Sequence, residues 1–365
     1  MDSKPIIITA ILILGFSILI SLFISANYSP AVSAYSELEE CKPLLYNGEG
    51  KIDLVFFSTK EQAEKYSETL LSAHPLDENS EAFNVFYIDS YVPECKIYKD
   101  AAIFCHSAEL VKKAASCPND FIFVLKDEPS SIRSSAYLNI GSINLNHPEA
   151  VIIHEFGHLF ANLAEEYVPA KLPFNSKNCV SKCSDFDGEI EGCFEGCSKS
   201  SLFRASENSV MRTLHSSHYG EFNSQLIESK ISRNTKPVIA GSAIRSVSSC
   251  REKNYFLIRG NSDSGNLKIT SFSLEQGCSP EVSSGDFSFE TRSLSGEFNP
   301  SLIFTESQSE SREQISGEVL ETDNVEFTLS VPGPEGGEIT IKDSAGNIAA
   351  QHNIENQQNQ LCRIK

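Results

Sequence analysis

The segment HEFGHLFANLAEEY, residues 154–167, concentrates side chains that bind metals and transfer protons. On a helix, His154 and His158 project from one face, about 6 Å apart along the axis, so both imidazoles can chelate one ion. Glu155, next to the first histidine, is then placed to act as general base on a water molecule. Tyr167 could stabilise an oxyanion, although packing is the commoner role of such a tyrosine.

A catalytic zinc site needs a third protein ligand and an open position for water. Asn162 tolerates the left-handed conformation that ends a helix, so we predict that the helix stops there and that Glu165 turns back as third ligand. In a continuous helix Glu165 would lie about 10 Å beyond His158 along the axis and could not share its ion. The alternative third ligands are the next carboxylate and two downstream imidazoles: Glu166, His215 and His218.

The surroundings of the motif favour a metal site over coincidence. A chance HExxH is expected in roughly one such chain in a hundred, so the bare pattern is only suggestive. Apolar residues recur with helical spacing through residues 151–163, and Pro148 and Glu149 are typical of a first helical turn. Unpaired imidazoles and a carboxylate are costly to bury in such a helix, and metal ligation removes that cost.

The motif resembles that of the IgA-peptidase-like zinc metallopeptidases, which reads HExGH, a gap of small residues, and then Leu-x-Asp-Glu-Tyr. The block FRASENSVMRTLHSSHYGEFNSQLIESKI, which begins at Phe203, is similar to that family's downstream Arg-Pro-x-Glu-Asn-x-Leu-Met-Arg-like element and the helix after it. The resemblance spans about residues 50–232 and does not extend to the C-terminal part.

This resemblance implies a zincin-like catalytic domain with zinc as its cofactor. It implies that His154 and His158 bind zinc, that Glu155 is the general base, and that Met211 lies in a turn that floors the metal site. Glu165 stands where the family often has aspartate, and an Ala-Asn pair replaces the family's glycine-rich gap.

Hydrophobic patterning predicts the elements that must position these residues. Three apolar runs are typical of buried strands, and two segments between them have helical spacing. In chain order these are IDLVFF, TKEQAEKYSETLLSA, FNVFYI, HSAELVKKAA and FIFVLK. The alternation predicts a mixed α/β layer structure over residues 51–235. Residues 134–146, SSAYLNIGSINLN, are expected to form an edge strand that borders a cleft.

From about Ser242 the composition shifts to serine, glycine, glutamate and asparagine, with short alternating runs such as YFLIRG and VEFTLSV. Regularly spaced short strands predict an all-β sandwich of roughly Ig-like size, about 100 residues, over residues 242–365. The boundary is expected within residues 233–241.

Residues 6–26 form an uncharged apolar run that is long enough to cross a bilayer and longer than a usual signal-peptide core. We expect residues 1–34 to be a transmembrane anchor or a cleaved signal sequence, and residues 35–50 to be a stalk. Lys4 precedes the run and acidic residues follow it, so the body should lie outside the cytoplasm, either on the cell membrane or secreted.

The chain contains 11 cysteines, which fits an oxidising compartment. The odd number leaves at least one of them without an intramolecular partner. Cys179, Cys183, Cys193 and Cys197 are expected to form two disulfides that pin a loop beside the cleft. A structural zinc site made of four thiolates is the alternative.

A net charge of −19 argues against a nucleic-acid partner. The sequence therefore predicts a membrane-tethered or secreted zinc endopeptidase that acts on protein or peptide substrates. The main alternative is a non-catalytic envelope or adhesion protein built on the same scaffold. Glu155 argues against this alternative, because a purely structural site needs no base. A metallohydrolase of another bond is a third hypothesis, since the same chemistry permits it.

Overall fold

The computed structural model describes residues 39–235, 247–263, 266–280, 285, 287–290, 295–298, 303–311, 314–321, 325–333, 338–343 and 345–353. The apolar run over residues 6–26, the first part of the expected stalk, most of the expected boundary segment and Cys362 lie outside the described residues. Within the described residues, no helix combines the length and hydropathy needed to cross a membrane.

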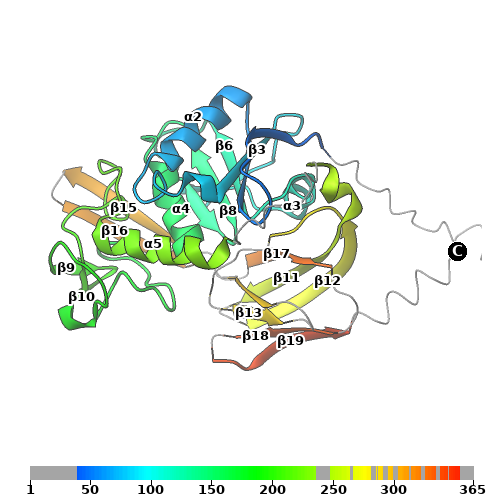
Figure 1. Cartoon of the computed structure of the whole chain (residues 1–365). Coiled ribbons are helices and arrows are strands. Elements are labelled where there is room, and N and C mark those ends of the chain that lie inside the picture. The colour runs from blue at the N-terminus through cyan, green and yellow to red at the C-terminus, as the bar shows by residue number, and fades with distance from the viewer. Residues whose placement is uncertain are drawn as a thin grey trace, which may run out of the picture. The chain divides into compact units, whose positions relative to one another are not determined.

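A six-stranded mixed sheet forms the centre of the α/β region, and three of its strands, β3, β6 and β8, are labelled in Figure 1. The strand order is β1-β3-β2-β6-β8-β7. Its strands are β1 (Lys42–Leu45), β2 (Ile52–Phe57), β3 (Phe83–Ile88), β6 (Phe121–Lys126), β7 (Ser135–Tyr137) and β8 (Ile140–Asn144). The four inner strands are parallel, while β1 and β7 pair antiparallel at the two edges. The three apolar runs predicted as buried strands are confirmed as β2, β3 and β6.

Two predictions about this sheet are wrong. Residues 42–45, expected within a stalk, form β1, and the neighbouring Cys41 is joined to Cys117 by a disulfide. This strand has only four residues, too few for its alternation to be read from the sequence. The single strand expected over residues 134–146 is instead a hairpin, in which Leu138 adopts a φ of 54° at the turn. Its first strand, β7, is the edge strand.

Four helices cover the two faces of the sheet: α2 (Lys60–Leu71), α3 (Ala108–Ala114), α4 (Val151–Ala161) and α5 (Glu221–Asn234). Successive strand residues point to opposite faces, so Leu54 and Phe56 join the core under α2, α4 and α5, while Val55 and Phe57 join the core under α3. The sequence predicted that Pro148 and Glu149 lie in the first turn of this helix. Helix α4 instead begins at Val151, and these two residues lie in a turn just before it.

Aromatic packing holds α4 on the sheet. The rings of Phe156 and Phe160 are stacked with centroids 5.0 Å apart, and both meet Phe121 of β6 edge-on at 5.6 and 5.7 Å. All three side chains are buried. Burial of one such ring contributes about 1.5–3 kcal/mol, so this cluster fixes the helix that carries the histidines.

Apart from the short 3-10 helix η3 (Val247–Glu252), the described residues of the C-terminal part form strands and their connections, as predicted for an all-β region. Strands β12, β11 and β17 form one sheet, and β14, β13, β18 and β19 form another, with one hydrophobic core shared between them. The bounds are β11 (Asn254–Asp263), β12 (Asn266–Gln276), β13 (Phe287–Glu290), β14 (Ser295–Phe298), β17 (Val325–Pro332), β18 (Glu338–Lys342) and β19 (Ile348–Asn353). A hairpin of β15 (Ile303–Ser311) and β16 (Gln314–Glu321) lies between β14 and β17 in sequence. An Ig-like topology remains a prediction.

Strand β11 is buried on both faces. Phe256 and Ile258 belong to the C-terminal core, whereas Tyr255 and Leu257 belong to the core under α3. The backbone N–H of Thr328 in β17 also donates to His106 Nε2, at 3.0 Å. The residues before and after the expected boundary therefore share a hydrophobic core.

The structure contains five disulfides in its described residues: Cys41–Cys117, Cys95–Cys105, Cys179–Cys197, Cys183–Cys193 and Cys250–Cys278. The two that follow the histidine motif are nested, which confirms the expected pair of disulfides and excludes a four-thiolate zinc site there. Short strands flank several of these bonds: β4 (Lys96–Tyr98), β5 (Ala102–Phe104), β9 (Phe194–Cys197) and β10 (Lys199–Arg204). Five disulfides are typical of an extracellular or secreted protein.

Candidate metal centre

Helix α4 carries both histidines and ends where the sequence predicts. The helix runs to Ala161, and Asn162 adopts the left-handed conformation with φ 52° and ψ 37°. The N–H groups of Asn162 and Leu163 donate to the carbonyls of His158 and Gly157, at 3.1 and 3.2 Å, which completes the cap. The chain reverses at this cap, so Glu165 returns to the face of the helix that presents the histidines.

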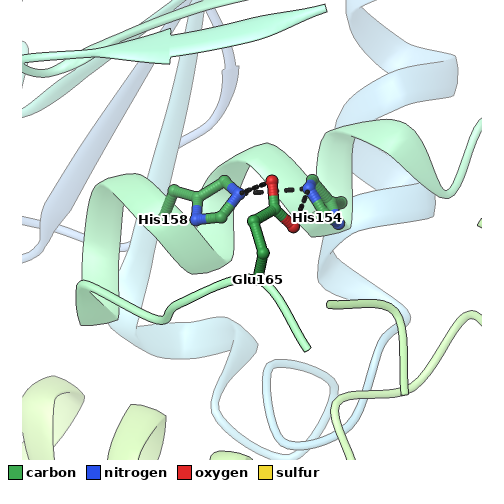
Figure 2. Close-up of side chains that lie close together, drawn as sticks. All are labelled: His154, His158 and Glu165. Atoms are coloured by element: carbon green, nitrogen blue, oxygen red, sulfur yellow. Dashed lines mark hydrogen bonds and ion pairs between the residues drawn. The ribbon is translucent and has the colours of Figure 1, made fainter. Parts of the chain in front are cut away.

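Figure 2 shows the carboxylate of Glu165 facing the two imidazole rings of α4. Its Oε2 atom lies 3.3 Å from His154 Nε2, and its Oε1 atom lies 3.3 Å from His158 Nε2. The two Nε2 atoms are 3.1 Å apart. Within the described part of the chain, these three residues are the one group of metal-ligating side chains whose ligand atoms all lie within 4.8 Å of one another.

Backbone carbonyls set the tautomer of each histidine. His154 Nδ1 lies 2.8 Å from the carbonyl oxygen of Val210, and His158 Nδ1 lies 2.7 Å from that of Leu163. A carbonyl oxygen can only accept, so each Nδ1 carries the hydrogen and donates it. Each Nε2 of the neutral ring is then left with a lone pair directed at Glu165, which is how metal-binding histidines are usually oriented.

The three residues fit a zinc ion. Two imidazole lone pairs and a carboxylate face one another, and the buried Glu165 Oε2 makes no hydrogen bond. Such a cluster of acceptors is unfavourable without a cation between them. Tetrahedral zinc with bonds of about 2.0–2.1 Å would separate its ligand atoms by about 3.3–3.4 Å. The observed separations of 3.1–3.3 Å are close to this value.

The charges in the site also favour a cation. Burial raises the pKa of Glu165, but the charges of His154 and His158 and their contacts with the carboxylate outweigh burial and hold this pKa well below its ordinary value. Burial lowers the pKa of His154, but the Glu165 carboxylate outweighs it and raises this pKa to about 9. The ionised carboxylate therefore attracts a positive charge to the Nε2 atoms, either a proton or a metal ion.

Glu155 is 7% exposed and lies on the helix between the two histidines. Burial raises its pKa, and the charges of His154 and His158 lower it by less, so the pKa is above its ordinary value. A carboxylate whose pKa moves toward neutral pH is a better proton acceptor and donor at that pH. Its environment is thus compatible with the role of general base.

Tyr167 lies beside the candidate ligand. Burial raises the pKa of Tyr167 well above its ordinary value, and the nearby negative charge of Glu165 raises it further. The phenol is therefore neutral. Stabilisation of an oxyanion by Tyr167 remains a prediction.

The alternative third ligands are not brought to the histidines. The Glu166 carboxylate accepts hydrogen bonds from Asn178, Ser209 and Asn223. His215 and His218 are exposed on the segment before α5. Among the candidates raised by the sequence, the geometry selects Glu165.

The segment before α5 lies under the middle of α4. Met211 is fully buried, and a Cβ atom added to Gly157 would lie 2.7 Å from its Sδ atom. The neighbouring Val210 supplies the carbonyl that orients His154. Sequence reasoning identified Met211 through a resemblance, but it missed the carbonyls of Val210 and Leu163, because every residue has a backbone carbonyl and none is marked by its side chain.

Neither a scan against protein-family models nor a search of curated proteins gives a match for this chain.

Proposed function

We propose that this protein is a zinc-dependent endopeptidase with a zincin-like catalytic region, and that His154, His158 and Glu165 hold the zinc. One observation carries the proposal: two oriented Nε2 atoms and a buried carboxylate oxygen without a hydrogen bond meet at separations typical of tetrahedral ligands. Glu155 on the same helix adds a base that a purely structural metal site would not need.

In the proposed reaction, Glu155 accepts a proton from the attacking water while the water oxygen bonds to the peptide carbonyl carbon. The same carboxyl group then donates this proton to the departing amine as the C–N bond breaks. The zinc, when bound, would supply Lewis acidity to the water and the carbonyl. The carbonyls of Val210 and Leu163 keep the imidazoles in the required tautomer.

The proposed setting is the cell exterior, with peptides or proteins as substrates. The five disulfides support that compartment. The apolar run over residues 6–26 supports a single-pass tether with the body outside, or secretion if this run is cleaved.

Glu155→Gln in the full chain tests the proposal. Glutamine keeps the size of the side chain but cannot accept the proton, so zinc content and thermal stability should match those of the wild type. Hydrolysis of casein or of a mixed peptide library should fall by about 10²- to 10⁴-fold. Glu149→Gln, at an exposed carboxylate just before the helix, serves as the matched control and should retain full activity.

Loss of zinc from Glu155→Gln would show that Glu155 holds the site together, and would contradict its role as base. A zinc-loaded wild type that hydrolyses no peptide would instead favour the scaffold hypothesis, in which the protein is a non-catalytic envelope or adhesion protein. Hydrolysis of another bond by the same preparation would favour the third hypothesis.

A further inference from the structure

Glu166, the residue after the candidate third ligand, is a buried carboxylate that does not face the histidines. It is 1% exposed. Its Oε1 atom accepts hydrogen bonds from Asn178 Nδ2 at 3.1 Å and from Asn223 Nδ2 at 2.9 Å, and its Oε2 atom accepts one from Ser209 Oγ at 2.5 Å. A buried carboxylate is unfavourable unless it is paired or hydrogen-bonded, and here three donors satisfy it.

The three donors come from three separate segments. Asn178 lies just before Cys179 of the nested disulfides, Ser209 lies in the segment that contains Met211, and Asn223 lies in the first turns of α5. Ser209 Oγ also accepts from the N–H of Met211 at 3.1 Å, so its own hydrogen is free to go to Glu166. The carboxylate of Glu166 is thus the point at which these segments meet.

The same network fixes the backbone on both sides of Glu165. Asn178 forms two hydrogen bonds with Ala164: its Oδ1 accepts from the N–H at 2.7 Å, and its Nδ2 donates to the carbonyl at 2.9 Å. The N–H of Glu166 donates to the Met211 carbonyl at 2.9 Å. Glu165 itself lies outside any helix or strand. These hydrogen bonds therefore take the place of the backbone hydrogen bonds that a helix or strand would supply.

We propose that Glu166 is a positioning residue for the zinc site. By joining Asn178, Ser209 and Asn223, its carboxylate holds the backbone at 164–166 so that the adjacent Glu165 side chain meets His154 and His158. This inference rests on the proposed zinc site, and it assigns no contact with zinc to Glu166.

Glu166→Ala and Glu166→Gln in the full chain test this role through zinc affinity, measured by competition with a chromophoric chelator, and through the absorption spectrum of the Co²⁺-substituted protein. Removal of a residue that positions a metal ligand typically weakens metal binding about 10- to 100-fold. The loss of zinc affinity in Glu166→Ala should lie in this range, and its cobalt spectrum should change. Glu166→Gln keeps an oxygen that can accept from Asn178 and Asn223, so it should restore most of the affinity.

A matched control separates positioning from general destabilisation. Asn84 on β3 is 2% exposed and forms three hydrogen bonds, to the N–H of Asn47, the carbonyl of Gly48 and the carboxylate of Asp53. Asn84→Ala should lower thermal stability without changing zinc affinity or the cobalt spectrum. An equal loss of zinc affinity in Asn84→Ala would overturn the inference, because the effect would then follow from stability alone.

Asn223→Ala is a milder variant that keeps the test decisive if Glu166→Ala does not fold. It removes one donor from Glu166, and zinc affinity should fall about tenfold or less. The inference would be overturned, and the zinc site left intact, if a folded Glu166→Ala kept the wild-type zinc affinity and cobalt spectrum. If only Asn223→Ala folds, the same result in that variant would overturn it. Absence of stoichiometric zinc from the wild type would overturn the zinc site itself, and the positioning role with it.

Discussion

Gly157, in the middle of helix α4, lies directly against Met211. A Cβ atom on this glycine would be 2.7 Å from Met211 Sδ and 3.0 Å from Tyr219 Cε1, both in fully buried side chains. Glycine destabilises a helix interior by about 0.5–1 kcal/mol relative to alanine. The close approach of Met211 is the physical reason for glycine at this position.

Gly157→Ala should therefore destabilise the protein although it improves helix propensity. The propensity gain is at most about 1 kcal/mol, whereas overpacking a buried contact costs about 1–3 kcal/mol. We expect a lower midpoint of chemical unfolding, and weaker zinc binding because the adjacent Val210 carbonyl moves away from His154. In a Met211→Ala background the penalty of Gly157→Ala should shrink, and an equal penalty in both backgrounds would exclude the sulfur contact as its cause.

Removal of any one proposed ligand should abolish stoichiometric zinc. His154→Ala, His158→Ala and Glu165→Ala each leave two protein ligands, which are too few for a stable site. Zinc per chain, measured by elemental analysis after gel filtration, should fall from one to near zero. His215→Ala and His218→Ala are the controls and should keep one zinc, whereas retention of zinc in Glu165→Ala would exclude that carboxylate as the third ligand.

The Cys179–Cys197 disulfide should contribute to zinc retention. Both sulfur atoms lie within 4.0 Å of the Glu165 carbonyl oxygen, which also accepts a hydrogen bond from Ser198 Oγ at 2.8 Å. Replacing both cysteines with serine should lower the free energy of unfolding by about 2–5 kcal/mol and speed zinc release to a chelator.

The Cys95–Cys105 pair, which lies in the core under α3, is the control for this measurement. Its replacement should also lower stability but should not speed zinc release at a temperature where both variants are folded. Similar release rates in the two variants would argue against a specific effect of the Cys179–Cys197 bond.

His106 should make the protein less stable in acid. Burial lowers the pKa of its imidazole to about 3, and its Nε2 accepts a hydrogen bond from the Thr328 N–H, which protonation would break. Below the ordinary pKa of about 6.5, the unfolded chain takes up a proton that the folded chain does not, so the free energy of unfolding falls as pH falls from 6.5 toward 3. The loss should reach about 2 kcal/mol at pH 5.

Urea unfolding at pH 7.5, 6 and 5 checks this pH dependence. His106→Gln keeps an acceptor for Thr328 but does not titrate, so its stability should fall less steeply with acid than that of the wild type. His215→Gln, at an exposed histidine, should have the wild-type slope. Identical slopes for all three proteins would exclude His106 as the source.

Local sequence chemistry predicted much of the α/β region that carries the candidate metal centre. The apolar spacing of residues 151–163 gave the helix of the two histidines, and the tolerance of Asn162 for a left-handed conformation gave its end, because both depend on residues within one or two turns. The prediction failed where pairing with distant residues decides the structure, as in β1, whose four residues are a strand only because β3 lies beside them.

The sequence by itself determined which ligand types are available and that His154 and His158 share a helix face, since a spacing of four residues fixes this geometry. Only the tertiary structure decided between Glu165 and Glu166. Neighbouring side chains on an extended chain point in different directions, and the contacts of Asn178, Ser209 and Asn223 turn Glu166 away from the histidines. These partners lie 12, 43 and 57 residues from Glu166, so no local pattern could identify them.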